Sequence, residues 1–260
     1  MTATSTSTPA ILLRRISYGD YDLILTLLTL SEGKVSVMAK SAKKSVKRFG
    51  GALELFSEVK VVFSSGPRRK LPILQEAVLV QPFSKIRSSI LKTAYASYWS
   101  ETLHIWMMEG KKEERIYHLL HSVLKELDMD ELPDALLSLI FQSRFLNLSG
   151  LAPDLRRCMV CRKPVEQLET PYLTFDPRRG GLSCRGCDGG ATEKPALSKG
   201  TVKLLDWIER EGLDHARRIR FSPRSLAEAQ RFLEIAVSHH LGKRPNSQVF
   251  LQKIRTGAKG

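Results

Sequence analysis

The chain has 260 residues, of which 42% are hydrophobic and 26% charged, and this composition excludes wholesale disorder and fibrous or collagen-like classes. No apolar run reaches the roughly 18 residues that a transmembrane helix needs, and the Ser- and Thr-rich start lacks the pattern of a secretory signal. Lysine and arginine outnumber acidic residues by 41 to 27, a net charge of +14, and such an excess favours nucleic acid or an anionic membrane surface as partner.

The basic surplus is concentrated at the two ends of the sequence. Residues 1–80 and residues 201–260 each carry a net charge of +6, residues 151–200 carry +3, and residues 81–150 carry −1. The middle of the chain is therefore expected to be a packing scaffold, flanked by regions that attract anions.

The N-terminal third reads as strands and turns after a loose tail over residues 1–9. Apolar or alternating stretches at 10–17, 23–30, 34–39, 54–63 and 71–80 are separated by turn residues. Five short strands fit a small closed barrel, and the oligonucleotide-binding (OB) barrel is the leading candidate. A generic meander is the alternative. We predict an OB-fold nucleic-acid-binding domain over residues 10–82.

The rest of the chain is mainly helical by its pattern. Apolar residues recur at three- and four-residue spacings in three stretches between residues 84 and 150, and again at 203–210 and 226–241. Residues 256–260 read as a tail. The predicted fold class is α+β, with the barrel followed by an α-helical domain over residues 83–255 that carries an insert at about residues 154–192.

Two Cys-x-x-Cys pairs lie in this insert and contain all four cysteines of the chain. They are Cys158 with Cys161 and Cys184 with Cys187, with 22 residues between the pairs. Two such turns can supply four thiolates to one tetrahedral ion, and four protein ligands leave no open position for catalysis. We expect one structural zinc ion. A dithiol redox pair, an iron–sulfur cluster and free core thiols are the alternatives. A chain without a signal sequence also favours a reducing compartment, where paired cysteines are more often metal ligands than disulfides.

Two basic segments of the predicted barrel are candidates for nucleic-acid binding. The first follows the third strand and contains no acidic residue; its cations are Lys34, Lys40, Lys43, Lys44, Lys47 and Arg48. The second, Arg68, Arg69 and Lys70, lies in the turn between the fourth and fifth strands, which in an OB barrel is a loop that grips single strands. Tyr18, Phe49 and Phe56 are candidate stacking residues, with core or turn roles as alternatives. A solvated loop is the alternative for the charge run.

Two further clusters allow more than one interpretation. Arg217, Arg218 and Arg220, with Arg224, form a patch that either extends a nucleic-acid groove or meets an acidic partner. The acidic group Asp128, Asp130, Glu131 and Asp134 permits a divalent-metal nuclease, although acidic residues are also favoured at helix starts. There is no Gly-x-x-x-x-Gly-Lys-Ser/Thr phosphate loop, so nucleotide hydrolysis of that type is not supported.

Residues 12–40 resemble the N-terminal signature of the bacterial recombination mediator family RecO. The matching features are the turn Tyr18, Gly19, Asp20 and Asp22, a Leu- and Thr-rich strand, and the run Gly33, Lys34 and Val35. The basic loop, residues 51–56 and residues 71–77 also match. In the second half, the cysteine pairs fall where many members of the family carry a zinc site.

The resemblance implies a non-enzymatic DNA repair factor, cytoplasmic and associated with the nucleoid. Members of the family bind single- and double-stranded DNA, anneal complementary strands, and act with RecR and often RecF. They thereby help to load RecA on strands coated by single-strand binding protein (SSB), whose acidic tail docks on the helical domain. The resemblance places DNA on the basic loop, and the arginines at residues 217–220 are electrostatically suited to the tail. An RNA-binding zinc-ribbon factor and a scaffold for acidic proteins are the rival classes.

Overall fold

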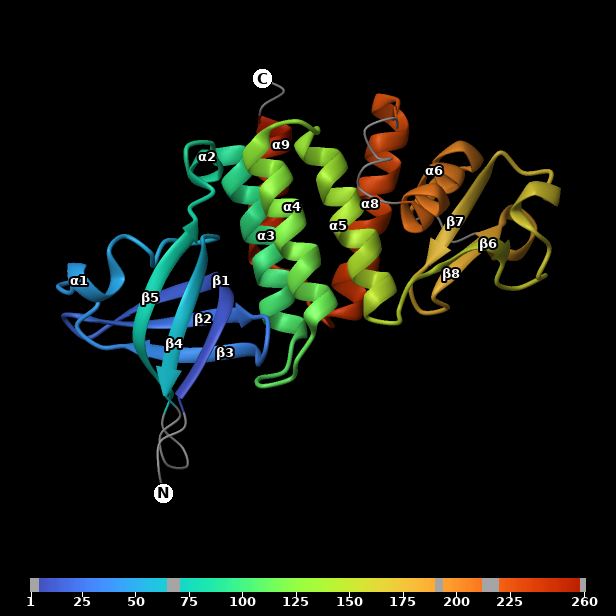
Figure 1. Cartoon of the computed structure of the whole chain (residues 1–260). Coiled ribbons are helices and arrows are strands. Elements are labelled where there is room, and N and C mark those ends of the chain that lie inside the picture. The colour runs from blue at the N-terminus through green and yellow to red at the C-terminus, as the bar shows by residue number, and fades with distance from the viewer. Residues whose placement is uncertain (1–4, 65–70, 190–193, 212–219, 258–260) are drawn as a thin grey trace. The chain divides into compact units, whose positions relative to one another are not determined.

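The structure is a computed structural model that describes residues 5–64, 71–189, 194–211 and 220–257 (Figure 1). The chain divides into two compact units. The barrel unit comprises Met1–Glu131 together with Pro245–Gly260, and the ribbon unit comprises Leu132–Arg244. Across the described ranges, the helices are all too short or too polar to span a bilayer.

The barrel unit begins with a closed five-stranded barrel in the order β1-β2-β3-β5-β4 (Figure 1). Its strands are β1 (Ser5–Tyr18), β2 (Asp22–Thr29), β3 (Gly33–Ala39), β4 (Glu58–Ser64) and β5 (Ile73–Gln81), with the four-residue helix α1 (Val46–Phe49) after β3. The long strand β1 pairs antiparallel with β4 through its first half and with β2 through its second half. β3 meets β5 in parallel at Met38 and Ile73, which closes the barrel. This five-stranded architecture confirms the predicted OB barrel.

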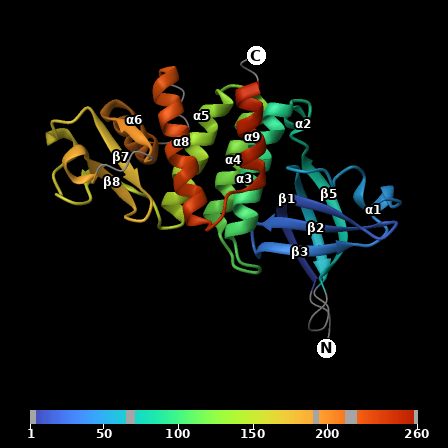
Figure 2. The ribbon, with the colours of Figure 1, turned by 180° about the vertical axis from the view of Figure 1, so that it is seen from behind.

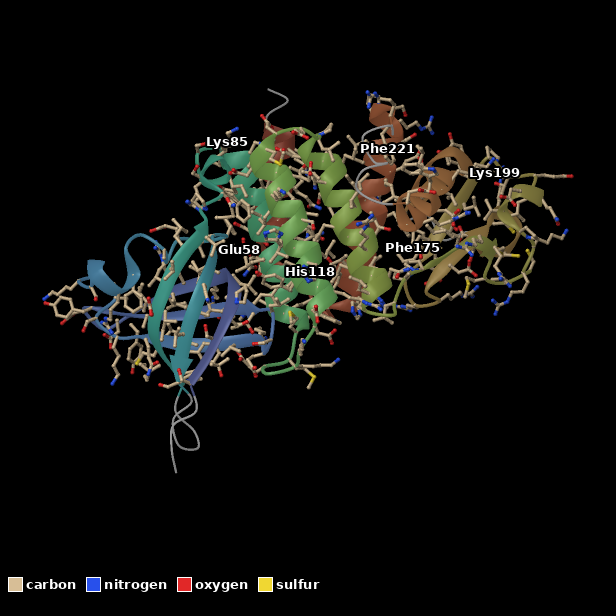
Figure 3. The ribbon with its side chains drawn as sticks, viewed as in Figure 1. Glu58, Lys85, His118, Phe175, Lys199 and Phe221 are labelled. Carbon is tan, nitrogen blue, oxygen red and sulfur yellow. The ribbon has the colours of Figure 1, made fainter. Side chains whose placement is uncertain are left out.

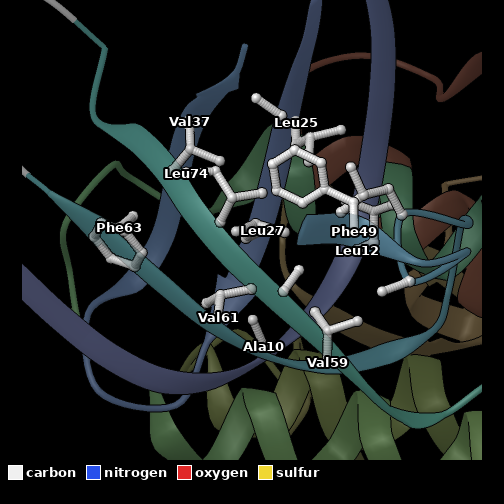
Figure 4. Close-up of a cluster of buried hydrophobic side chains, with 14 of the residues drawn as sticks. Ala10, Leu12, Leu25, Leu27, Val37, Phe49, Val59, Val61, Phe63 and Leu74 are labelled. Carbon is white, nitrogen blue, oxygen red and sulfur yellow. The ribbon is translucent and has the colours of Figure 1, made fainter. Parts of the chain in front are cut away.

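Alternate residues of the strands fill the barrel with apolar side chains (Figure 4). Leu25, Leu27, Val37, Val61 and Leu74 are all completely buried. In a strand, successive side chains point to opposite faces, so the period-two pattern of β3 and β4 places one set of residues inside the barrel. Burial of each such side chain contributes roughly 1.5–3 kcal/mol relative to exposure.

Four helices complete the barrel unit: α2 (Ser84–Arg87), α3 (Ile90–Trp106), α4 (Glu114–Met129) and α9 (Asn246–Gly257). Figure 2 shows α9 alongside α3. The Glu101 carboxylate on α3 accepts hydrogen bonds from the backbone N–H groups of Asn246 and Ser247, which satisfies donors at the start of α9. The last helix of the chain is therefore fixed to the N-terminal unit.

Glu58, at the start of β4, joins the barrel to α4 (Figure 3). Its carboxylate accepts a hydrogen bond from the Tyr117 hydroxyl at 3.0 Å and contacts His121 Nε2 at 3.1 Å. Burial and the adjacent Glu58 carboxylate raise the pKa of Tyr117, so the phenol stays protonated and donates.

The ribbon unit is built on α5 (Asp134–Leu148), α6 (Lys199–Arg210) and α8 (Pro223–His240). Between α5 and α6 lies a four-stranded sheet in the order β6-β8-β7-β9, formed by β6 (Asp154–Cys158), β7 (Tyr172–Asp176), β8 (Gly181–Cys184) and β9 (Ala196–Ser198). The short 3-10 turns η1 (Val165–Gln167) and η2 (Arg185–Cys187) flank its strands. Phe175 of β7 packs edge-on against Phe232 of α8 with ring centroids 4.7 Å apart, which anchors the sheet to the helices (Figure 3).

The structure differs from the sequence prediction in three places. The prediction of a loose tail over residues 1–9 is wrong from Ser5 onward, because Ser5 to Pro9 pair with β4. The helix α9 was not predicted, and it packs with α3. The two units also differ from the predicted division at residues 82 and 83, because α3 and α4 cluster with the barrel.

Gly33 offers a test of the packing between the barrel and the α3–α4 connection. Gly33 has a φ of +68°, and a Cβ there would lie 1.9 Å from the Lys111 carbonyl oxygen. We expect Gly33→Ala to reduce the free energy of unfolding by about 2–4 kcal/mol, from the backbone conformation and the steric overlap together. Urea unfolding measures this loss.

Gly19→Ala is the matched control. Gly19 has a similar φ of +56°, but no atom lies within 4 Å of the position that a Cβ would take there. It should therefore lose only about 1–2 kcal/mol. Equal losses at the two glycines contradict the close contact at Gly33.

Candidate nucleic-acid interface and metal centre

Two connections meet at one end of the barrel, the β1–β2 turn and the loop between β3 and α1. The Asp22 carboxylate accepts a hydrogen bond from the Ser41 backbone N–H at 2.7 Å. The Lys43 backbone N–H donates to the Tyr21 carbonyl at 3.1 Å. These two bonds join the basic loop to the aromatic turn, so we name the combined surface of residues 18–22 and 40–45 the loop–turn surface.

The loop–turn surface combines exposed cations with exposed aromatic rings. Lys40, Lys43 and Lys44 are exposed, and the Lys44 ammonium lies 3.4 Å from the centroid of the Tyr21 ring. Tyr18 and Tyr21 are 54% and 46% exposed. Cations that follow a phosphate chain, together with rings that stack on bases, are the usual components of a single-strand binding surface.

Arg48 organises the basic loop rather than extending into solvent. Its guanidinium donates to the Lys40 carbonyl at 2.6 Å and to the Ser45 hydroxyl at 2.9 Å. The backbone N–H groups of Lys44 and Ser45 both donate to the Ser41 carbonyl, which makes the loop a compact turn. The lysines are therefore presented by a hydrogen-bonded loop.

A cavity of about 360 Å³ opens beside this loop. Arg15, Lys43 and Glu54 supply charged groups to its lining, and the Arg15 guanidinium is held by the Leu53 carbonyl and by Glu54, each at 3.0 Å. The cavity adds a concave element with a polar edge to the loop–turn surface.

Several residues that were predicted to bind nucleic acid are buried or lie outside the described part of the chain. Lys34 is only 8% exposed, and its ammonium donates to the His104 carbonyl at 2.9 Å, so its assignment to phosphate binding is wrong. Phe49 and Phe56 are buried in the structure and are core residues, not stacking residues. Lys47 lies on α1, and its side chain is outside the described part of the chain, as are Arg68, Arg69 and Lys70.

Sequence reasoning missed Tyr21 and Arg15. Tyr21 lies in the turn whose tyrosine and aspartates were noticed, but nothing local distinguishes an exposed ring from a buried one. Arg15 lies on β1 opposite Leu25, and its side chain lines the cavity beside the basic loop. Tyr21 is identified by its contact with Lys44 of the basic loop, and Arg15 by its ion pair with Glu54.

The four cysteines converge although 22 residues separate the two pairs. Their four Sγ atoms all lie within 4.8 Å of one another, and the Sγ atoms of Cys161 and Cys184 are 3.9 Å apart. Tetrahedral thiolate ligands at about 2.3 Å from a zinc ion are about 3.8 Å from each other. The arrangement thus fits one tetrahedral ion, as the spacing predicted.

Backbone N–H donors near this cluster favour the thiolate form of Cys158. Burial acts to raise the pKa of Cys158, but N–H groups of Cys184, Cys161 and Val160 outweigh it and lower the pKa to about 6. The Cys184 N–H approaches Cys158 Sγ at 3.4 Å. Hydrogen bonding with Cys184, with a smaller contribution from burial, raises the pKa of Cys187 to about 12.

The other predicted clusters do not form a common site. Some of their residues lie outside the described part of the chain, and others make structural contacts. Arg217 and Arg218 lie outside the described residues, whereas Arg220 is exposed. Arg224 is held by Glu228 at 3.1 Å and lies over the Tyr172 ring.

In the acidic group, Asp128 accepts from the backbone N–H groups of Lys85 and Ile86, and Asp130 pairs with Lys92 at 2.6 Å. Both carboxylates are thus used in helix packing, and the cysteines are the group with metal-ligand geometry in the described ranges.

The fold and the cluster define an OB-barrel protein with a four-cysteine knuckle. The family Recombination protein O N terminal matches residues 1–83, and Recombination protein O C terminal matches residues 87–248. The chain therefore belongs to the RecO family of DNA repair and recombination proteins.

The sequences of several curated relatives match this chain over nearly its whole length. The DNA repair protein RecO of Desulfatibacillum aliphaticivorans is 42% identical over 96% of this chain and 97% of its own. That of Desulfosudis oleivorans is 42% identical over 96% and 98%, and that of Syntrophus aciditrophicus is 32% identical over 95% of each.

Arg48→Lys tests the organisation of the basic loop. Lysine keeps the charge but cannot reproduce the two guanidinium hydrogen bonds in one geometry. Loss of these bonds should cost about 1–2 kcal/mol locally, so the Lys44 and Ser45 amides should exchange hydrogen about tenfold faster. Lys43→Arg, at an exposed position of the same loop, should leave the exchange unchanged; a similar acceleration in both variants argues against the role of Arg48.

Proposed function

We propose that this protein is a non-catalytic mediator of DNA repair and recombination that binds single- and double-stranded DNA through the loop–turn surface. The observation that carries the proposal is the junction of an acid-free lysine loop with an exposed tyrosine turn at one end of an OB barrel. Phosphate contacts by lysine are independent of base sequence, so the surface suits DNA of any sequence.

Strand annealing follows from the same electrostatics. Two DNA strands repel each other, and a chain of net charge +14 reduces this repulsion by replacing their counterions. We propose that the protein anneals complementary strands without nucleotide hydrolysis, and that annealing weakens as salt concentration rises. Membership of the RecO family supports this role.

The partners expected from the family resemblance belong to the same proposal. They are RecR, the acidic tail of SSB and, in some pathways, RecF, with RecA loaded on SSB-coated DNA as the outcome. The proposed site of action is the cytoplasm, in association with the nucleoid. Arg220 is the described member of the arginine patch proposed for an acidic partner.

We further propose that the cysteine cluster holds one structural zinc ion. Four thiolates complete the tetrahedron, and the ion would stabilise the small sheet by joining the two cysteine turns. Cys158 and Cys161 would hold it from the first turn, and Cys184 and Cys187 from the second.

The double variant Lys43→Glu/Lys44→Glu tests the DNA surface. Each lost phosphate contact should reduce the slope of log affinity against log salt by about 0.7 for a single strand, and affinity should fall at every sequence tested. Titrations of a fluorescent oligonucleotide at several salt concentrations measure both quantities.

Lys60→Glu/Lys125→Glu is the matched control, because both lysines are exposed in the barrel unit and the change in net charge is the same. Unchanged single-strand affinity in Lys43→Glu/Lys44→Glu contradicts the assignment of the surface. A strong preference for RNA favours the rival class of RNA-binding factors.

Replacement of Cys161 by serine tests the metal. We expect the wild-type protein to contain one zinc ion per chain, and Cys161→Ser to lose it because a neutral hydroxyl is a poor fourth ligand. Zinc content and thermal unfolding of the same samples measure the effect. Full zinc occupancy in the variant, or iron in the wild type, contradicts the proposal.

A further inference from the structure

The cysteine cluster is formed by two turns, residues 158–161 and residues 184–187, whose sulfur atoms differ in their access to solvent. Cys158 is completely buried, both cysteines of the second turn are half-buried, and Cys161 is exposed. The neighbouring Val160 is 46% exposed, so the end of the first turn lies at the surface. A reagent in solution can therefore reach the sulfur of Cys161 directly.

Backbone hydrogen bonds hold the first cysteine turn against β8 and the second turn. The Met159 N–H donates to the Leu182 carbonyl at 2.8 Å, and the Cys184 N–H approaches Cys158 Sγ at 3.4 Å. The first turn is itself closed by the Arg162 N–H, which donates to the Cys158 carbonyl at 2.9 Å. None of these bonds involves a metal, so the sulfur atoms of the two turns stay close together when no ion holds them.

One pair of sulfur atoms connects the exposed position with the second turn. The Sγ atoms of Cys161 and Cys184 are 3.9 Å apart. A disulfide bond is about 2.05 Å long, so these two atoms need to approach by roughly 2 Å to form one. Cys158 is less available as a partner of Cys161, because its sulfur is buried and already accepts the Cys184 N–H. The geometry thus favours a bond between the two turns over a bond within the first turn.

We propose that Cys161 is a site of oxidation by hydrogen peroxide, and that the product is a disulfide between Cys161 and Cys184. The inference rests on the proposed zinc ion, because a metal holds its cysteine ligands as thiolates and the thiolate is the nucleophilic form of cysteine. The exposed ligand of the cluster is then the one that a small oxidant meets first.

The reaction takes place in two steps. The Cys161 thiolate attacks one oxygen of the peroxide, the O–O bond breaks, and hydroxide leaves while a sulfenic acid forms on Cys161. The Cys184 thiolate then attacks this sulfur, the S–O bond breaks, and a second hydroxide leaves. The two sulfur atoms together lose two electrons, the peroxide gains them, and two protons from solvent convert the hydroxide ions to water.

Release of zinc follows from this disulfide. Cys158 and Cys187 are the ligands that remain, and two thiolates do not complete the four-coordinate site of a structural zinc ion. The disulfide replaces the ion as the link between the turns, so the sheet should keep its fold in the oxidised form. Thiol reductants restore the four ligands, since disulfides are transient in a reducing compartment.

Peptide mapping of the full-length protein tests the assignment. The protein is treated with hydrogen peroxide, the remaining thiols are alkylated, and trypsin then cleaves after arginine. The cleavage gives three peptides, which carry Cys158 with Cys161, Cys184 alone and Cys187 alone. We expect the first two peptides to be cross-linked, with fragmentation locating the bond at Cys161. Each disulfide should be accompanied by the release of one zinc ion, measured with a colorimetric chelator.

Two serine variants form a matched pair, because each removes one zinc ligand from the second turn. Cys187→Ser should still form the Cys161–Cys184 disulfide in peroxide. Cys184→Ser cannot form it, so its Cys161 should accumulate as a sulfenic acid and take up severalfold more of the sulfenic-acid reagent dimedone. Circular dichroism establishes whether each variant is folded, and the map of the wild-type protein depends on neither of them.

The outcomes separate this proposal from the zinc proposal on which it rests. A disulfide within the first turn, or peroxide treatment that leaves the four thiols and the bound zinc unchanged, overturns the oxidation site and leaves the structural zinc standing. Equal dimedone labelling of Cys184→Ser and Cys187→Ser overturns the role of Cys184. Wild-type protein that lacks zinc but still forms the cross-link contradicts the zinc proposal alone, and protein that shows neither contradicts both.

Discussion

The pairing of β1 with both β2 and β4 is the constraint on which the rest of the barrel unit depends. This strand pairs with β4 from Ser5 to Ile11 and with β2 from Ala10 to Tyr18, with an irregularity in the second pairing between Leu12 and Arg14. Because β1, β2 and β3 run antiparallel in succession, the β1–β2 turn and the end of β3 must lie at the same end of the barrel. The lysine loop and the tyrosine turn meet as a consequence of topology.

The charged residues of the barrel unit divide into those that build it and those that remain available. Lys34 and Arg48 donate to backbone carbonyls, and Glu58 is held by a tyrosine and a histidine of α4. A charge that is hydrogen-bonded in a partly buried position stabilises one packing arrangement and is costly to leave without its partner. Net charge alone therefore overstates the number of cations available to a ligand, because some of them are structural.

The sequence was sufficient for the features that depend on local pattern. Period-two alternation located β3 and β4, helical spacing located α3, α4 and α5, and the two Cys-x-x-Cys turns indicated a shared ion. The pattern was insufficient where a partner distant in sequence decides the outcome. Lys34 is buried because the α3–α4 connection covers β3, and α9 forms against Glu101, which is 145 residues away from Asn246. Strand β1 extends back to Ser5 because β4 pairs with it, although its first residues have little apolar character.

The barrel unit is discontinuous in sequence, since α9 returns to α3 after the entire ribbon unit has been made. The ribosome synthesises the ribbon unit before Asn246 to Gly257, so the Glu101 carboxylate has no helix to cap until that unit has been made. The barrel strands are therefore available to pair before their helical support can be completed. A premature stop after α8 would thus damage the first part of the molecule as well as shorten the last.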